Sequence, residues 1–245
     1  MGDVRFEPSP RWVRSMFGGV MVASSKRMRL LYEPGRLPVY YFPRDDVRQD
    51  LLAPSDHLTE SEHLGTARYF DVHASERRAE HAAWCYDNPE LSGYVALDWN
   101  AMDAWYEEDD EIFVHPRDPY KRVDVLRSSR HVQVVLGGET VADSTRPSLL
   151  FETHMPVRYY IPRMDVRLEL LTPSETRTRC PYKGVASYWS ANVNGQAFTD
   201  IVWGYEVPIP ECPKIEQLMC FFNERVDAIY VDGDLQEKPQ TKWSL

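Results

Sequence analysis

Short apolar runs of about four to eight residues recur along the whole chain, separated by prolines and glycines. Examples are SLLFE, VRYYI, ASYWSANV, DIVWGY and LMCFF, which are rich in the aromatic and β-branched residues that favour strands. No segment carries a long apolar pattern with the 3.6-residue period of a helix. The pattern predicts an all-β protein with at most short helical turns, one after Pro43 and one after Pro162.

The chain lies on itself when it is shifted by 119 residues. Arg11 then aligns with Arg130 (11 + 119 = 130), and the glycine pair that starts at Gly18 aligns with the pair that starts at Gly137. From Arg11 to Asp56, 22 of 46 ungapped positions are identical, whereas chance gives about 3. This identity establishes an internal duplication. The apolar runs that flank each glycine pair predict a β-hairpin in each copy.

The duplication predicts three parts. Residues 1–110 form a first, divergent copy of the repeat domain, residues 111–129 form an ordered linker or strap, and residues 130–245 form the second copy. The linker is rich in Phe, Val, Tyr and Leu, whereas a flexible linker is rich in Gly and Ser. A small insertion in the second copy shifts the alignment, so that Asp103 meets Asp227.

Composition and charge limit the kinds of binding partner and the cellular location that we expect. The formal net charge of -10 argues against a nucleic acid polymer as the partner, because proteins that bind nucleic acids need a basic face. No apolar stretch approaches the roughly 18 residues of a membrane helix, and the N-terminus lacks the features of a signal peptide. The four cysteines form no C-x-x-C pair and are typical of reduced thiols. We therefore expect a cytoplasmic protein with a small-molecule partner, no membrane partner and no cofactor.

Three segments of the second copy resemble one family. They are ETHMPVRYYIPRMDVR from Glu152, CPYKGVASYW from Cys180 and WGY from Trp203. They resemble the domain of unknown function 427 family, also filed under a nucleotidyltransferase-type heading, in a tandem form with HPRDPY between the two copies. The resemblance implies two β-tent domains, similar to methionine-R-sulfoxide reductases. Some β-tent proteins hold zinc on paired C-x-x-C motifs, which this chain lacks, so no zinc is predicted.

The loop RTRCPYKG, from Arg177 to Gly184, is the sharpest candidate for chemistry. Cys180 is followed three residues later by Lys183, and a thiol beside cations can act as a nucleophile. Lys183 can equally bind an anion or a carbonyl oxygen, and Tyr182 is a candidate ligand contact beside it. The alternative is structural: a small buried cysteine followed by a tight turn.

The first copy has lost this loop. It carries Ser61 at the position of Cys180 and Leu64 at the position of Lys183, although the next residue, Gly65, is kept. A purely structural turn has less reason to diverge so far between two copies. The asymmetry therefore favours a specific role for the loop in the second copy.

The motif P-R-x-D-V-R is present in both copies and gives a second candidate. In the second copy, Arg163, Asp165 and Arg167 can clamp an anionic ligand, because an arginine can bind an anion through two parallel hydrogen bonds. The alternative is an ion pair in which Arg163 or Arg167 binds Asp165 and pins the loop. The presence of the motif in both copies favours this structural interpretation.

Glu152 and several aromatic residues form a third candidate set. Glu152 ends an apolar strand, where a desolvated carboxylate can serve as a general base, and the alternative is a hydrogen-bonded core glutamate. Tyr160, Tyr188 and Trp203 are candidate ligand contacts, with packing in the core as their alternative. Because side chains alternate along a strand, Tyr159 and Tyr160 point to opposite faces.

Four histidines crowd the first copy, at His57, His63, His73 and His81. Their spacing matches no familiar pattern of metal ligands, so no metal site is predicted.

Three functional hypotheses remain open. The first is an enzyme that acts on a small molecule, with Cys180, Lys183 and Glu152 as the reactive set of the second copy. The second is a non-catalytic module that binds a metabolite, a nucleotide or a peptide between the duplicated domains. The third is redox chemistry through Cys180, for which Cys212 or Cys220 would have to fold close.

Overall fold

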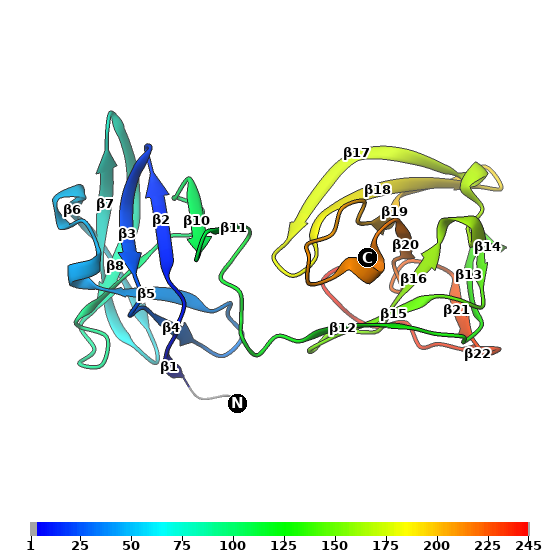
Figure 1. Ribbon diagram of the computed structural model, residues 1–245, viewed down its shortest axis with the longest axis horizontal. Helices are drawn as coiled ribbons and strands as arrows, with labels where there is room; N and C mark the ends of the chain where they lie inside the picture. The colour runs from blue at the N-terminus through cyan, green and yellow to red at the C-terminus, as the bar shows by residue number, and fades with distance from the viewer. Residues whose placement is uncertain (1–3, 245) are drawn as a thin grey trace. The chain divides into compact units, whose positions relative to one another are not determined.

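The structure is a computed structural model that describes residues 4–244. The chain divides into two compact units, Met1–Asp118 and Pro119–Leu245, which we call the first and second units. Each unit contains one seven-stranded and one four-stranded antiparallel sheet (Figure 1). The predicted all-β class is confirmed, and the four antiparallel sheets form two halves.

In the first unit, the seven-stranded sheet has the order β1-β4-β5-β9-β8-β7-β6 and the four-stranded sheet the order β11-β10-β2-β3. The strands are β1 (Arg5–Pro8), β2 (Val13–Phe17), β3 (Val20–Ser25), β4 (Arg29–Tyr32), β5 (Val39–Pro43), β6 (Leu52–Ser61), β7 (Gly65–Ala74), β8 (Arg77–Tyr86), β9 (Tyr94–Leu97), β10 (Ala104–Glu107) and β11 (Asp110–Ile112).

In the second unit, the corresponding orders are β12-β15-β16-β20-β19-β18-β17 and β14-β13-β21-β22. The strands are β12 (Val123–Arg127), β13 (Val132–Leu136), β14 (Glu139–Ser144), β15 (Ser148–Glu152), β16 (Arg158–Pro162), β17 (Leu171–Cys180), β18 (Gly184–Val193), β19 (Gln196–Gly204), β20 (Leu218–Phe221), β21 (Ala228–Val231) and β22 (Asp234–Leu235).

The two units repeat each other strand by strand. Trp84 pairs with Ala96 across β8 and β9, and Trp203 pairs with Cys220 across β19 and β20. Trp203 thus corresponds to Trp84 at an offset of 119 residues (84 + 119 = 203), and Cys220 corresponds to Ala96 at an offset of 124 residues (96 + 124 = 220). The second unit therefore has five additional residues between β19 and β20.

The segment expected to be a linker contributes strands to both units. Asp110–Ile112 pairs with β10 of the first unit, and Val123–Arg127 pairs with β15 as an edge strand of the second unit. The structural repeat therefore begins at β1 and β12, earlier than the alignment that starts at Arg11.

The predicted turns are present. The hairpins β2–β3 and β13–β14 turn at the two glycine pairs. Short 3-10 turns follow Pro43 and Pro162, because proline is tolerated where a helical turn begins. The 3-10 turns of the described residues are η1 (Arg44–Asp46), η2 (Gln49–Leu51), η3 (Arg163–Asp165), η4 (Leu168–Leu170) and η5 (Pro213–Ile215).

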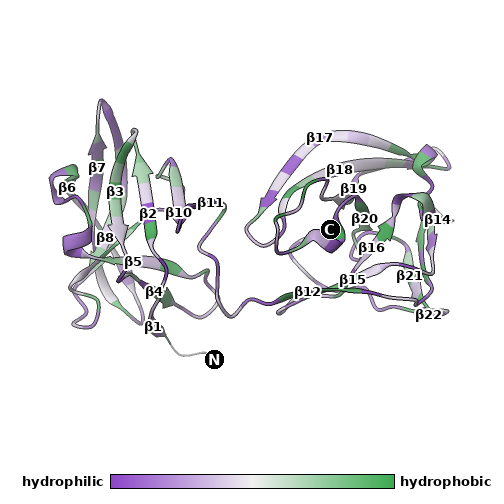
Figure 2. Cartoon of the chain, viewed as in Figure 1, coloured by the Kyte–Doolittle hydropathy of each residue, from purple (hydrophilic) through white to green (hydrophobic). Residues whose placement is uncertain are grey.

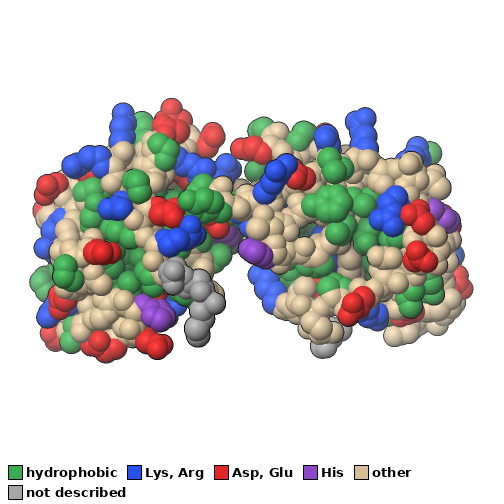
Figure 3. Space-filling model, turned by 90° about the horizontal axis from the view of Figure 1, so that it is seen from below, with side chains coloured by type: hydrophobic (Ala, Val, Ile, Leu, Met, Phe, Trp, Pro, Cys, Tyr) green, Lys and Arg blue, Asp and Glu red, His purple; other side chains and the backbone are tan. Residues whose placement is uncertain are grey.

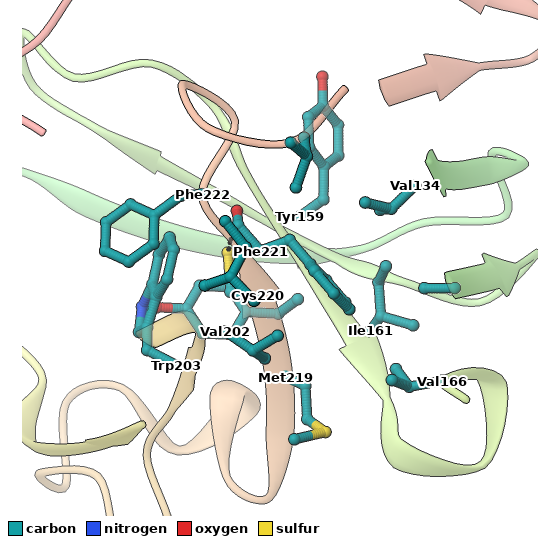
Figure 4. Packing of buried hydrophobic residues seen from close by; sticks show 14 of the residues in the cluster. Val134, Tyr159, Ile161, Val166, Val202, Trp203, Met219, Cys220, Phe221 and Phe222 are labelled. Carbon is teal, nitrogen blue, oxygen red and sulfur yellow. Dashed lines mark hydrogen bonds between the residues drawn. The ribbon is translucent and has the colours of Figure 1, made fainter. Parts of the chain in front are cut away.

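The core of the second unit is one cluster that joins its two sheets. Val134 comes from the four-stranded sheet, and Ile161, Met219 and Phe221 come from the seven-stranded sheet. Figure 4 shows these side chains packed together around the buried strands β16 and β20.

In the first unit, the two faces of the seven-stranded sheet carry separate clusters. Tyr40 packs with Val13 of the four-stranded sheet, whereas Tyr41 packs with Leu31 and Leu64 in a cluster that has no residue from that sheet. Neighbouring tyrosines thus point to opposite faces, as strand alternation requires. On the same face of the second unit, Lys183 takes the position of Leu64.

The surface carries charged side chains of both signs. Figure 2 shows hydrophilic residues along part of β17, and Figure 3 shows acidic and basic side chains interspersed on the visible face of each unit. Within residues 4–244 there is no helix with the length and apolar character of a membrane span.

Candidate functional site

The turn between β17 and β18 holds the first group of the site. Cys180 ends β17 and pairs with Gly184 at the start of β18, so Lys183 lies in the turn between them. Gly184 has a φ of +106°, a backbone angle that residues other than glycine rarely adopt. The loop with the five extra residues covers this turn, because the backbone N–H of Ile209 donates to the carbonyl of Lys183 at 3.1 Å.

Lys183 reaches inward to Glu152 at the end of β15. Its Nζ donates to Oε2 of Glu152 at 2.5 Å, and both side chains are 11% exposed. Lys121 approaches the same carboxylate from just before β12, with its Nζ 3.2 Å from Oε1. Lys121 also donates to the carbonyl of Thr153 at 3.0 Å, which fixes its position. Two ammonium groups thus share one carboxylate, and the group carries a net positive charge.

Electrostatic coupling favours the charged forms of Lys183 and Glu152. Burial opposes the charge of Lys183, but Cys180 and Glu152 together outweigh burial and raise the pKa of Lys183 above its ordinary 10.5. Burial opposes the charge of Glu152 as well, but Lys183 and then Lys121 lower its pKa below the ordinary 4.5. A carboxylate with a lowered pKa is a weak base at neutral pH. The geometry therefore favours Glu152 as the residue that holds Lys183 in place.

Cys180 differs from the other cysteines in its exposure. It is partly exposed, whereas Cys85, Cys212 and Cys220 are buried, and all four are free thiols. Cys212 lies close enough to Lys183 and Cys180 to interact with both, and burial is the main cause that raises its pKa to about 11. Burial likewise raises the pKa of Cys220 to about 12. Cys180 is therefore the thiol that a solute can reach most easily.

The equivalent corner of the first unit is apolar. Leu64 takes the position of Lys183, is 4% exposed, and packs in a hydrophobic cluster. Glu33, the counterpart of Glu152, pairs with Arg36 of its own loop at 3.2 Å. The charged group is thus confined to the second unit, although the strands around it are the same.

The expected ligand contacts Tyr160 and Trp203 lie in the core. Tyr160 is 1% exposed and accepts a hydrogen bond from Nε1 of Trp203 at 3.2 Å. Tyr41 and Trp84 make the same bond in the first unit at 3.0 Å. Figure 4 shows Trp203 packed beside Phe222 within this buried region. Because both units share the pair, its position indicates a role in the fold.

Tyr182 and Tyr188 lie nearer the surface and are half-buried. The hydroxyl of Tyr188 shares a 2.8 Å hydrogen bond with Thr178 on the neighbouring strand β17, and Tyr69 shares a 3.2 Å bond with Thr59 in the first unit. Tyr188 also interacts electrostatically with Cys180. It therefore lies beside the candidate site while serving a contact common to both units.

The expected ion pair within P-R-x-D-V-R is wrong, because Asp165 pairs with Arg146. Nη2 of Arg146 lies 2.8 Å from Oδ1 of Asp165, and the hydroxyl of Ser144 donates to Oδ2 at 2.7 Å. Arg167 instead binds two other carboxylates, and Arg163 lies over the ring of Trp189 at 5.2 Å. The motif is nevertheless structural at Asp165, since the first unit repeats this contact.

Arg163 does not join the charged group. Its Nη1 donates to Oε1 of Gln217 at 3.3 Å, so it faces the end of the loop between β19 and β20. The structure thus brings Cys180, Lys183 and Glu152 together and leaves Arg163 outside their hydrogen-bonded set.

Two of the four histidines of the first copy, His57 and His81, form a stacked pair. The rings of His57 and His81 lie 4.5 Å apart, and Nδ1 of His81 is 2.8 Å from the hydroxyl of Ser55. Among residues 4–244, no group of three or more His, Cys, Asp or Glu side chains has an arrangement suited to a metal ion.

Lys121 is a member of the site that was not among the residues expected to act. Cys212 is one of the two partners that the redox hypothesis requires, and Tyr205 ends the WGY segment that carries the family resemblance. Lys121 lies in the segment assigned to the linker, and Cys212 lies in the inserted loop. Tyr205, which follows β19, is 5% exposed, and burial followed by the charge of Cys180 holds its pKa well above 10. The insertion between β19 and β20 is visible in the sequence as the change of offset from 119 to 124, and Cys212 lies in the loop that contains it.

This arrangement can bind an anion and can support a nucleophilic thiol. The positive charge of Lys183 lies beside a reachable sulfur, and a cation stabilises the negative charge of a thiolate or of an oxyanion that forms nearby. Glu152 limits the positive charge and orients it. Within residues 4–244, the first unit has no counterpart of the bond between Lys183 and Glu152, since Leu64 replaces the lysine.

Comparison with known proteins identifies a family. No curated protein matches the chain. The family model described as a domain of unknown function (DUF427) matches residues 5–108 and 124–232, one segment in each unit. The two segments start 119 residues apart (124 − 5 = 119) and together span most of the chain. The chain therefore belongs to the DUF427 family, in a tandem two-domain form.

Proposed function

We propose that the second unit binds a small anionic molecule at the Cys180–Lys183 turn, and that the thiol of Cys180 reacts with it. Lys183 and Lys121 supply the positive charge, and Glu152 positions Lys183. The observation that carries the proposal is the pair of lysines on one buried carboxylate, which is confined to the second unit. The two units share one fold, and the charged group is found in the second of them.

The thiol is the reactive group of this proposal. Attack by the sulfur on an electrophilic carbon forms a carbon–sulfur bond, and the leaving group departs with its electron pair. Lys183 stabilises the negative charge of the sulfur before attack, or of an oxygen on the attacked carbon. A non-catalytic site would use the same lysines and would not need the sulfur.

Protection of Cys180 from alkylation tests the proposal. Iodoacetamide modifies reachable thiols, and mass spectrometry reads each cysteine separately. We expect succinate or citrate to slow modification of Cys180, and Lys183→Leu, which installs the residue of the first unit, to abolish that protection. Lys238→Leu is the matched control, because Lys238 is exposed and lies outside the site.

The outcomes separate the candidate functions. Protection that disappears in Lys183→Leu and persists in Lys238→Leu supports anion binding at the turn. Loss of binding in Cys180→Ser, measured by calorimetry, would count against the non-catalytic module, which does not need the sulfur. Absence of protection by either carboxylate, with Cys180 modified equally fast in all variants, would refute the assignment.

A further inference from the structure

A second basic feature lies elsewhere on the second unit. An open hollow of about 360 Å³ has a size at the lower end of small-molecule sites. Its lining residues are Arg127, Ser128, Arg146, Ser148, Pro213, Lys214, Glu216 and Leu218. None of them belongs to the charged group around Glu152.

Three separate segments bring three cations to this hollow. Arg127 ends β12, Arg146 lies in the turn between β14 and β15, and Lys214 lies in η5. Nζ of Lys214 donates to the carbonyl of Val125 at 3.0 Å, which ties η5 to β12 and places Lys214 near Arg127. The hollow therefore lies between the end of β12, the turn after β14 and the loop between β19 and β20 that carries η5.

The positive charges of the hollow are only partly balanced. Arg146 is paired with Asp165, but Lys214 donates to a neutral carbonyl. Among residues 4–244, the guanidinium of Arg127 has no hydrogen-bond or ion-pair partner. Glu216 is the acidic residue of the lining. Arg127 and Lys214 thus retain charge and donors for a ligand, within a protein whose formal net charge is -10.

We propose that this hollow binds the phosphate group of a small phosphorylated molecule. A phosphate carries up to two negative charges and three strong acceptor oxygens, which suit a guanidinium and an ammonium from different elements. The hydroxyls of Ser128 and Ser148 lie in the same lining and can complete the set of donors. The proposal goes beyond the function proposed for the Cys180 turn, since it uses none of the same residues.

The first unit has no equivalent of these two cations. Pro8 aligns with Arg127 (8 + 119 = 127), and Glu90 aligns with Lys214 (90 + 124 = 214). Arg29 takes the position of Ser148 and donates to the carbonyl of Phe6 at 2.6 Å. The first unit thus carries an acidic residue where the second unit has Lys214, so it lacks the positive charge that an anion needs.

Isothermal titration of the full chain tests the proposal with three probes: inorganic phosphate, glycerol 3-phosphate and adenosine 5′-monophosphate. We expect saturable binding of at least one probe. Lys214→Glu should weaken that binding at least tenfold, and Arg127→Gln should weaken it several-fold. Tighter binding of a phosphate ester than of phosphate would identify a phosphorylated metabolite as the ligand, and the reverse order would identify the free ion.

Two controls make the test specific. Lys238→Glu changes the net charge by the same amount as Lys214→Glu at an exposed lysine outside the hollow, and it should leave binding unchanged. Lys183→Leu should also leave phosphate binding unchanged, which separates this site from the Cys180 turn. Absence of binding by all three probes, or equal weakening in Lys238→Glu and Lys214→Glu, would overturn the proposal.

Discussion

Lys183 and Leu64 occupy the same position of the repeat, and both are almost fully buried. Lys183 ends in a 2.5 Å hydrogen bond to Glu152, whereas Leu64 ends in a cluster of apolar side chains. A buried lysine needs a partner because an unpaired charge is costly to remove from water. This exchange marks the second unit as the one that holds a charged site.

The partnership of Lys183 and Glu152 predicts strong thermodynamic coupling. Lys183→Met should destabilise the protein by about 2–4 kcal/mol, because Glu152 then keeps only Lys121 in a largely buried place. Adding Glu152→Gln to Lys183→Met should cost less than the sum of the single changes. Denaturant unfolding measures all four proteins. Additive losses would show that the two side chains act independently.

The lowered pKa of Glu152 predicts a pH dependence of stability. A carboxyl whose pKa is lower in the folded than in the unfolded protein stabilises the fold fully above the unfolded value of about 4.5. That contribution is lost as the pH falls through the folded pKa. The difference in stability between the native protein and Glu152→Gln should therefore be largest near pH 6–7 and should shrink below about pH 4.5. A constant difference over this range would contradict the pairing.

A second buried ion pair, between Arg158 and Glu224, stabilises the second unit. Nη2 and Nη1 of Arg158 lie 2.6 and 2.7 Å from the two carboxylate oxygens, and the guanidinium lies 5.4 Å from the ring centres of both Trp203 and Trp243. Arg158→Met should cost about 3–5 kcal/mol, because it leaves a buried carboxylate unpaired. Glu224→Gln in that background should restore part of the loss. Thermal unfolding checks both results, and a loss under 1 kcal/mol would contradict the account.

The shared contact of Asp46 and Asp165 predicts similar effects in both units. Each carboxylate accepts from a serine and pairs with an arginine: Asp46 with Arg27 at 2.7 Å, and Asp165 with Arg146 at 2.8 Å. Asp46→Asn and Asp165→Asn should each lower stability by about 1–2 kcal/mol. Neither change should alter the reactivity of Cys180, and an effect of Asp165→Asn on that thiol would contradict a purely structural role.

The fold class followed from the sequence because strand alternation and turn residues are local signals. The duplication added the strand correspondence, since 22 identities within 46 positions leave little freedom for the fold to diverge. The boundaries were harder, because β12 is a short edge strand. Its burial depends on pairing with β15, and edge strands have a weaker apolar pattern than central strands.

The candidate site was predicted only in part, because the sequence shows residues that are close along the chain and not those that the fold brings together. Cys180 and Lys183 are close in the sequence, and Glu152 was conspicuous at the end of an apolar strand. Lys121 has no such signal, because only the pairing of β12 with β15 brings it beside Glu152. The partner of Asp165 was missed because the turn between β14 and β15 supplies Arg146 from 19 residues away.

The central claim is that Lys183 creates a positive environment for a reachable thiol. The most direct test compares the rates at which Cys180 reacts with iodoacetate, which is anionic, and with iodoacetamide, which is neutral. We predict that Lys183→Leu lowers the ratio of the iodoacetate rate to the iodoacetamide rate about five-fold, as expected for the loss of one nearby positive charge. Lys238→Leu should leave this ratio unchanged. Slow modification of Cys212 and Cys220 in every variant would show that the fold is intact. An unchanged ratio in Lys183→Leu would contradict the account.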